Sequence, residues 1–83
     1  MKLIGVFKYK EEVLFNIFDY GHCFFCTLNF LIDWKQFTFA QKSIIGKAFK
    51  LSKQFKSVEE FKNGTKNYDS EFYFEWKEIE NEN

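Results

Sequence analysis

The spacing of apolar residues along this chain changes from period two to a helical period and back, and this change constrains the fold more than any other feature. Strand-like runs cover 3–9, 13–19 and 23–32, and in the last of these every even position is apolar. Residues 40–55 carry apolar side chains at helical spacing, and period two returns over 71–79. The pattern predicts an α+β fold: a four-stranded, mostly antiparallel sheet in the order β-β-β-α-β, with one main helix packed on one face.

The main helix is predicted to begin at a capping box, because Thr38 precedes Gln41 by three residues. Its expected core stripe consists of apolar residues that fall within an arc of about 80° on a helical wheel: Ala40, Ile44, Ala48, Leu51 and Phe55. Gly46 lies inside this helix at a cost of about 1 kcal/mol relative to alanine, and close packing is one explanation for its presence.

A second capping box, formed by Ser57 and Glu60, predicts a separate short helix over 58–62. Asn63 and Gly64 follow it, and glycine is the usual residue just beyond the C-terminus of a helix. We therefore expect two helices between the third and fourth strands, with the second much shorter than the first and the segment 66–70 as a loop.

The length and composition of the chain indicate one folded domain. Its 83 residues suffice for a single domain, expected over 1–79, followed by an acidic frayed tail over 80–83. Thirteen Phe, four Tyr and two Trp supply enough apolar area for a core. The net charge of zero argues against a disordered polyelectrolyte or a DNA-coating protein. The chain has no Arg and so lacks the side chain that binds phosphate or guanine in a bidentate manner.

Cys23 and Cys26, with His22 beside them, form the one metal-like or redox-like motif. Within one strand, their odd separation places the two thiols on opposite faces, with Cα atoms roughly 10 Å apart, which is too far for a disulfide. We therefore expect two reduced structural cysteines, His22 in a turn, and neither a metal site nor a cofactor. A single His, no Gly-rich phosphate loop and no nucleophile paired with a base predict that the protein is not an enzyme.

The N-terminal segment predicts a cytoplasmic protein. Residues 1–8 include Lys2 and Lys8 and precede a charged turn, so they are too short and too charged for a signal peptide. The longest apolar run, over 23–32, is far shorter than the ~20 residues that a membrane helix needs. We expect no membrane partner.

Charge is distributed unevenly along the chain. No acidic residue lies between Asp33 and Glu59, whereas that interval contains six lysines: Lys35, Lys42, Lys47, Lys50, Lys53 and Lys56. From Asp69 onward the chain is acidic, with Lys77 as the exception. One interpretation is a solvated helix face whose charge is partly neutralised by the C-terminal strand. The other is a docking surface for an acidic partner or for nucleic acid.

Two apolar residues sharpen the docking interpretation. Ile45 and Phe49 are one turn apart and fall outside the predicted core stripe, among the lysines. An apolar pair surrounded by lysines is typical of a protein-binding hot spot. The predicted partner-binding residues are Lys42, Ile45, Phe49, Lys50, Lys53 and Lys56. The competing explanation is that the segment 34–39 or the short second helix covers Ile45 and Phe49.

The predicted function is a small, non-catalytic protein-binding inhibitor or adaptor. The abundance of Phe, Ile, Lys and Asn indicates an A/T-rich coding sequence, as in some bacteria, phages and other viruses. The overall profile is similar to that of small phage accessory proteins, anti-CRISPR inhibitors among them, which implies a host or defence protein with an acidic surface as the partner. The alternatives are a weak single-stranded nucleic-acid binder that uses the Lys-rich helix, and a structural domain that self-associates as a homodimer.

Overall fold

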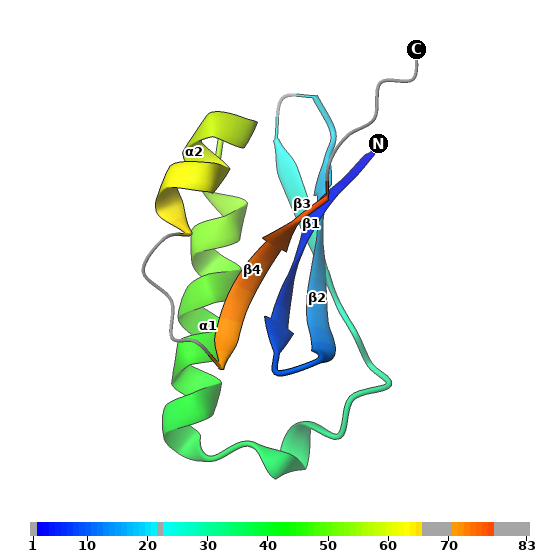
Figure 1. Ribbon diagram of the computed structural model, residues 1–83, viewed down its shortest axis with the longest axis vertical. Helices are drawn as coiled ribbons and strands as arrows, with labels where there is room; N and C mark the ends of the chain where they lie inside the picture. The colour runs from blue at the N-terminus through cyan, green and yellow to red at the C-terminus, as the bar shows by residue number, and fades with distance from the viewer. Residues whose placement is uncertain (1, 22, 66–70, 78–83) are drawn as a thin grey trace.

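The computed structural model describes residues 2–21, 23–65 and 71–77 and shows one sheet with both helices on the same face (Figure 1). The elements in chain order are β1 Lys2–Tyr9, β2 Glu12–Asp19, β3 Phe24–Leu28, the 3₁₀ helix η1 Trp34–Gln36, α1 Phe39–Lys53, α2 Val58–Gly64 and β4 Phe72–Trp76. All strand pairs are antiparallel, and the strands lie in the order β3-β2-β1-β4. The predicted α+β architecture, with a main helix and a short second one, is confirmed.

A row of phenylalanines across the sheet forms the centre of the core. Phe7 on β1 lies opposite Phe15 on β2 and Phe74 on β4, with ring centroids 5.1 and 4.7 Å away. Phe61 from α2 packs edge-on against Phe74 at 5.7 Å. Phe7, Phe15 and Phe61 are fully buried, so the aromatic residues supply the core that a chain of this length needs.

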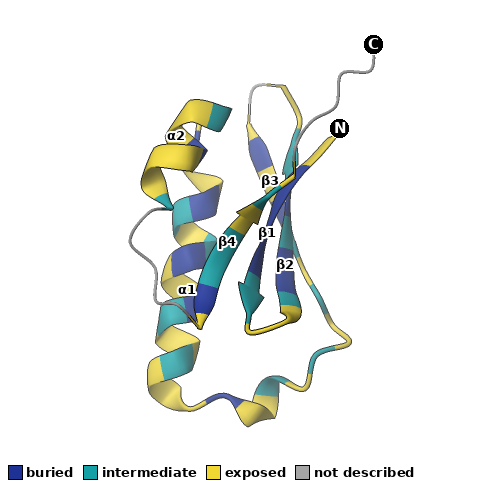
Figure 2. Ribbon diagram, in the orientation of Figure 1, coloured by how far each residue is buried: buried dark blue, intermediate teal, exposed yellow. Residues whose placement is uncertain are grey.

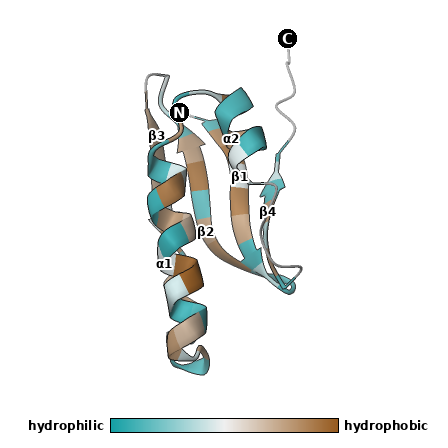
Figure 3. Ribbon diagram, turned by 90° about the vertical axis from the view of Figure 1, so that its left-hand side faces the viewer, coloured by the Kyte–Doolittle hydropathy of each residue, from teal (hydrophilic) through white to brown (hydrophobic). Residues whose placement is uncertain are grey.

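Helix α1 begins where the sequence predicts. The Thr38 hydroxyl accepts a hydrogen bond from the Gln41 N–H at 3.1 Å, and the Gln41 side chain accepts one from the Thr38 N–H at 2.9 Å. The capping box thus satisfies two of the N–H groups that a helix start leaves without partners. Figure 3 shows α1 along the β3 side of the sheet and α2 over β1.

The buried stripe of α1 is rotated from the predicted one. The buried residues are Ile45, Ala48 and Ser52. The predicted stripe is therefore wrong in part, since Ala40 is exposed and Ile44 and Leu51 are only half-buried, whereas Ala48 and Phe55 are buried. The cause is Ser52, whose hydroxyl donates to the Ala48 carbonyl at 2.8 Å. A small side chain with its hydrogen bond satisfied packs as closely as an apolar one.

Strand β3 ends four residues earlier than predicted because of Asn29. The Asn29 amide nitrogen donates to the Val13 carbonyl at 2.9 Å, and its amide oxygen accepts from the Leu31 N–H at 3.0 Å. The Asn29 carbonyl in turn accepts from the Trp34 indole N–H at 3.2 Å. These side-chain bonds replace the strand ladder with a turn.

The early end of β3 leaves apolar residues in solvent. Phe30 is 83% exposed and Leu31 is 94% exposed. The expectation that the even positions through Ile32 lie on one buried face is correct for Phe24 and Cys26 and wrong for Leu28 and Phe30. Ile32 lies beyond the strand and is half-buried against the core. The chain turns away from the sheet at this point (Figure 1).

Helix α2 begins at the predicted cap, with the Ser57 hydroxyl accepting from the Glu60 N–H at 3.1 Å. The Glu60 carboxylate accepts from the Lys56 N–H at 2.9 Å, one residue earlier than in a standard capping box. Gly64 is the last residue of α2 and not the residue after it. A Cβ at Gly64 would lie 2.7 Å from the Phe55 ring, so close packing accounts for this glycine. The predicted loop 66–70, the predicted turn at His22 and the tail 80–83 lie outside the described residues.

The two cysteines lie in different environments. Cys26 is 6% exposed within β3, whereas Cys23 is exposed and precedes β3, so the expectation that both lie in one strand is wrong. Burial raises the pKa of the Cys26 thiol to about 11, against a smaller opposing effect of the Lys53 ammonium and the Ser52 hydroxyl.

We expect the two thiols to differ strongly in alkylation. At pH 8.5 Cys26 is protonated as well as buried, and the thiolate is the form that reacts. Mass spectrometry after brief iodoacetamide treatment should find the native protein modified at Cys23, with Cys26 modified only after denaturation. Equal rates of modification at the two positions in the native protein would contradict the burial of Cys26.

Candidate functional site

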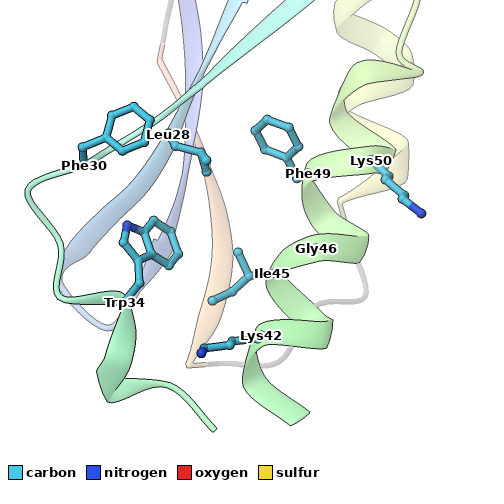
Figure 4. Close-up of a pocket in the computed structure, with 8 residues that line it drawn as sticks. All are labelled: Leu28, Phe30, Trp34, Lys42, Ile45, Gly46, Phe49 and Lys50. Carbon is cyan, nitrogen blue, oxygen red and sulfur yellow. The ribbon is translucent and has the colours of Figure 1, made fainter. Parts of the chain in front are cut away.

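An apolar pocket of about 460 Å³ opens between residues 42–50 of α1 and the segment that runs from the end of β3 to η1 (Figure 4). One wall consists of Leu28, Phe30 and Trp34, and the α1 wall consists of Lys42, Ile45, Gly46, Phe49 and Lys50. We call this pocket the α1 groove. It exists because β3 ends early and the chain diverges from α1 before returning to it.

The wall opposite α1 is held in place by hydrogen bonds and ring packing. The indole of Trp34 donates to the Asn29 carbonyl, and its ring lies 5.8 Å from that of the buried Phe37. Leu28 is 38% exposed and Phe30 is largely exposed, so this wall presents apolar surface to solvent. The Trp34 side chain, which is held by these contacts, loses little entropy when a partner covers it.

The α1 wall is deeper in the molecule than the sequence indicates. Ile45 is only 6% exposed, and Phe49 is half-buried with its ring edge-on to Phe15 at 5.1 Å. The expectation that Ile45 and Phe49 lie outside the core is therefore wrong. Phe15 of the sheet packs against Phe49, and Trp34 faces Ile45 and Phe49 across the groove (Figure 4). Helix α2 does not line the groove.

The lysines of α1 have no acidic partner within the described part of the chain. Lys42 reaches toward Trp34, whereas Lys50 projects outward from the rim of the groove (Figure 4). Lys53 places its ammonium 4.9 Å from the centre of the Phe49 ring. The ion pair of the described residues joins Lys8 on β1 to Glu75 on β4 at 3.2 Å. Neutralisation of α1 by the C-terminal strand is not observed there, since β4 lies at the opposite edge of the sheet from β3.

The structure brings together most of the predicted partner-binding residues. Lys42, Ile45, Phe49 and Lys50 line the groove, and Lys53 extends it through Phe49. Lys56 follows α1 and is not part of the groove lining.

The sequence analysis missed Leu28, Phe30 and Trp34, which form the opposite wall. Leu28 and Phe30 were assigned to a longer strand with one buried face. The signal that could have identified them is Asn29, a residue that favours turns, between two apolar neighbours.

We expect Phe49 and Phe30 to differ in their contribution to stability. Phe49→Ala should lower the free energy of unfolding by about 2–3 kcal/mol, because it removes a ring packed on Phe15. Phe30→Ala should change it by less than about 0.5 kcal/mol, because that side chain lies mostly in solvent. Urea denaturation measures both, with the buried Phe55→Ala as the destabilised reference. An unchanged midpoint for Phe49→Ala would show that this ring is not part of the core.

No group of three or more His, Cys, Asp or Glu side chains within the described ranges could hold a metal ion. Neither α1 nor α2, the two α-helices of those ranges, has the length and apolar character to cross a membrane. A scan against protein-family models and searches of curated proteins and of solved structures found no match to this chain.

Proposed function

We propose that the chain is a small protein-binding module, acting as an inhibitor or adaptor, that docks an acidic segment of a partner protein in the α1 groove. The observation that supports this most is the combination of an open apolar groove with lysines that have no acidic partner among the described residues. Exposed apolar surface with a polar rim is typical of a protein interaction site.

The apolar walls would provide most of the affinity. Fully burying one large apolar side chain contributes about 1.5–3 kcal/mol before the costs of association. Phe30 and Leu28 already lie at the groove surface, and the Trp34 indole is held in the same wall by its hydrogen bond to the Asn29 carbonyl. Aromatic side chains of this kind dominate measured interface energies, so we expect Phe30 and Trp34 to be the main anchors.

The lysines would select the partner. Lys42 and Lys50 flank the groove, with Lys47 and Lys53 exposed on the same helix. Positive charge at the rim of an interface accelerates the approach of an acidic partner and disfavours a basic one, with a smaller effect on affinity. From the similarity of the sequence profile to small phage accessory proteins, we further propose that this partner is a host or defence protein. The chain and its partner would then meet in the cytoplasm.

Binding of single-stranded nucleic acid by the lysines is the competing proposal. Lysine ammonium groups contact phosphates, and bases stack on exposed rings. The concave shape of the groove and the half-buried state of Phe49 and Trp34 favour protein, because a base needs an exposed ring face. Self-association as a homodimer is a third candidate. In that case a second copy of the chain would compete with any other partner for the groove.

The test uses a library of random 16-residue peptides displayed on phage and selected against the whole chain. We expect enriched peptides to carry more Asp and Glu than Lys and to contain large apolar residues. Phe30→Ser should weaken their binding at least tenfold, measured by fluorescence polarisation, with little loss of stability because Phe30 is exposed. Lys42→Glu should slow their association and reduce its salt dependence.

Phe25→Ser is the matched control, because Phe25 is also exposed but lies between the buried Phe24 and Cys26, on the sheet face away from the helices. It should leave peptide affinity within twofold. Peptides that bind wild type and Phe30→Ser equally would rule out the groove. Micromolar binding of a single-stranded oligonucleotide at physiological salt, lost on Lys50→Glu, would favour nucleic acid instead.

A further inference from the structure

Gly46 is the one glycine of this chain without an internal structural reason. The chain has four glycines. Gly21 has a φ of +103°, a conformation that other residues rarely adopt. Gly5 and Gly64 each lie against a phenylalanine ring, where an added Cβ would come within 2.7 Å. At Gly46 the backbone is helical, and an added Cβ would meet nothing within 4 Å.

The position of Gly46 makes this unoccupied space relevant to binding. Glycine is less favourable than alanine inside a helix, because it loses more conformational freedom on folding. Gly46 stands at the middle of the 15-residue α1 and lines the α1 groove. The groove therefore has a stretch of bare helix backbone on its α1 wall, with Ile45 beside it (Figure 4).

Two lysines flank this bare stretch at regular distances. Lys42, Gly46 and Lys50 follow one another at intervals of four residues and so form a single row along α1. At 1.5 Å of rise per residue, the two lysines lie about 12 Å apart along the helix axis. A partner that crosses α1 at Gly46 would pass between two positive charges.

We propose that the partner segment is an acidic amphipathic α-helix that crosses α1 at Gly46 with its backbone in close contact. The proposal rests on the proposed function and specifies the partner further. The apolar row of the partner helix fills the space between Ile45 and Trp34. Carboxylates on either side of that row meet Lys42 and Lys50. The lysine side chains are long and flexible enough to fold over a helix seated between them.

A helix satisfies the requirements of the groove better than an extended segment. The groove side chains other than the two lysines are apolar, and the backbone groups of α1 are bonded within the helix. A segment buried there therefore has to satisfy its own backbone hydrogen bonds, as a helix does. Small residues at a helix crossing let the two axes approach more closely than the usual 8–10 Å. Glycine at position 46 permits the closest approach of all.

The test compares Gly46→Ala and Gly46→Leu with Ser43→Ala, using peptides selected on the wild-type chain as probes. Ser43 is exposed on α1 outside the groove lining, so its replacement raises helix propensity without altering the groove. We expect Gly46→Ala to raise the thermal unfolding temperature by about 4 °C and yet to weaken peptide binding at least tenfold. Gly46→Leu should abolish binding, and Ser43→Ala should leave it unchanged. Circular dichroism should show that the peptides gain helix on binding.

The outcomes separate this inference from the proposed function. If peptide binding depends on Phe30 but is unchanged or tighter in Gly46→Ala, or if the bound peptides gain no helix, the groove binds protein and the helical crossing is wrong. If no selected peptide depends on Phe30, both proposals are wrong. If the measured unfolding temperature of Gly46→Ala is equal to or higher than that of the wild type, loss of binding in this variant does not result from unfolding.

Discussion

The close contact between α1 and the edge strand β3 determines where the rest of the molecule lies. Ala48 and Ser52 are fully buried at this contact, and the Ser52 hydroxyl lies beside the Cys26 thiol of β3. Small side chains on both elements let the second half of α1 lie close against the strand. Beyond Leu28, where β3 ends, no strand continues along α1 on this side, and Leu28 itself lines the α1 groove. Figure 2 shows this difference, with buried residues in the middle of α1 and exposed residues in its first turn.

The aromatic core follows from the same arrangement. Helix α1 packs along the β3 side of the sheet and leaves the same face of β1 and β4 uncovered. Helix α2 covers that part of the face. Phe61 of α2 packs against Trp76 at 4.5 Å and against Phe74, while the absence of a side chain at Gly5 makes room for its ring. Because α2 packs on β1 and β4, it does not cover the space beside α1 where the groove lies. The groove is thus a consequence of how two short helices share one four-stranded sheet.

Local signals in the sequence predict most of the elements. Both helix starts are identified by the capping residues Thr38 and Ser57. The strand order could not be predicted, because the pairing of β1 with β4 joins segments at opposite ends of the chain. Sequence periodicity has no information about such distant contacts.

The two local errors both concern polar residues in apolar surroundings. The expected core stripe of α1 omits Ser52, although the Ser52 hydroxyl bonds to the Ala48 carbonyl and lets this residue pack in the core. Asn29 was placed within a strand, although its amide forms the turn that ends β3. The first error misplaced Ile45 and Phe49, and the second hid Phe30. One wall of the groove involves the first error and the other wall involves the second, so only half of the groove lining could be predicted.

The central claim is that the groove is open to solvent in the free chain, with Gly46 bare on its wall. Solvent paramagnetic relaxation measured by NMR with a soluble gadolinium chelate tests this directly. We predict strong relaxation of the Gly46 Hα protons and of the Phe30 ring protons, and weak relaxation at Ala48 and Ile17, which are fully buried. If the Gly46 and Phe30 protons are protected as well as those of Ala48, the groove is closed in solution and the account is contradicted.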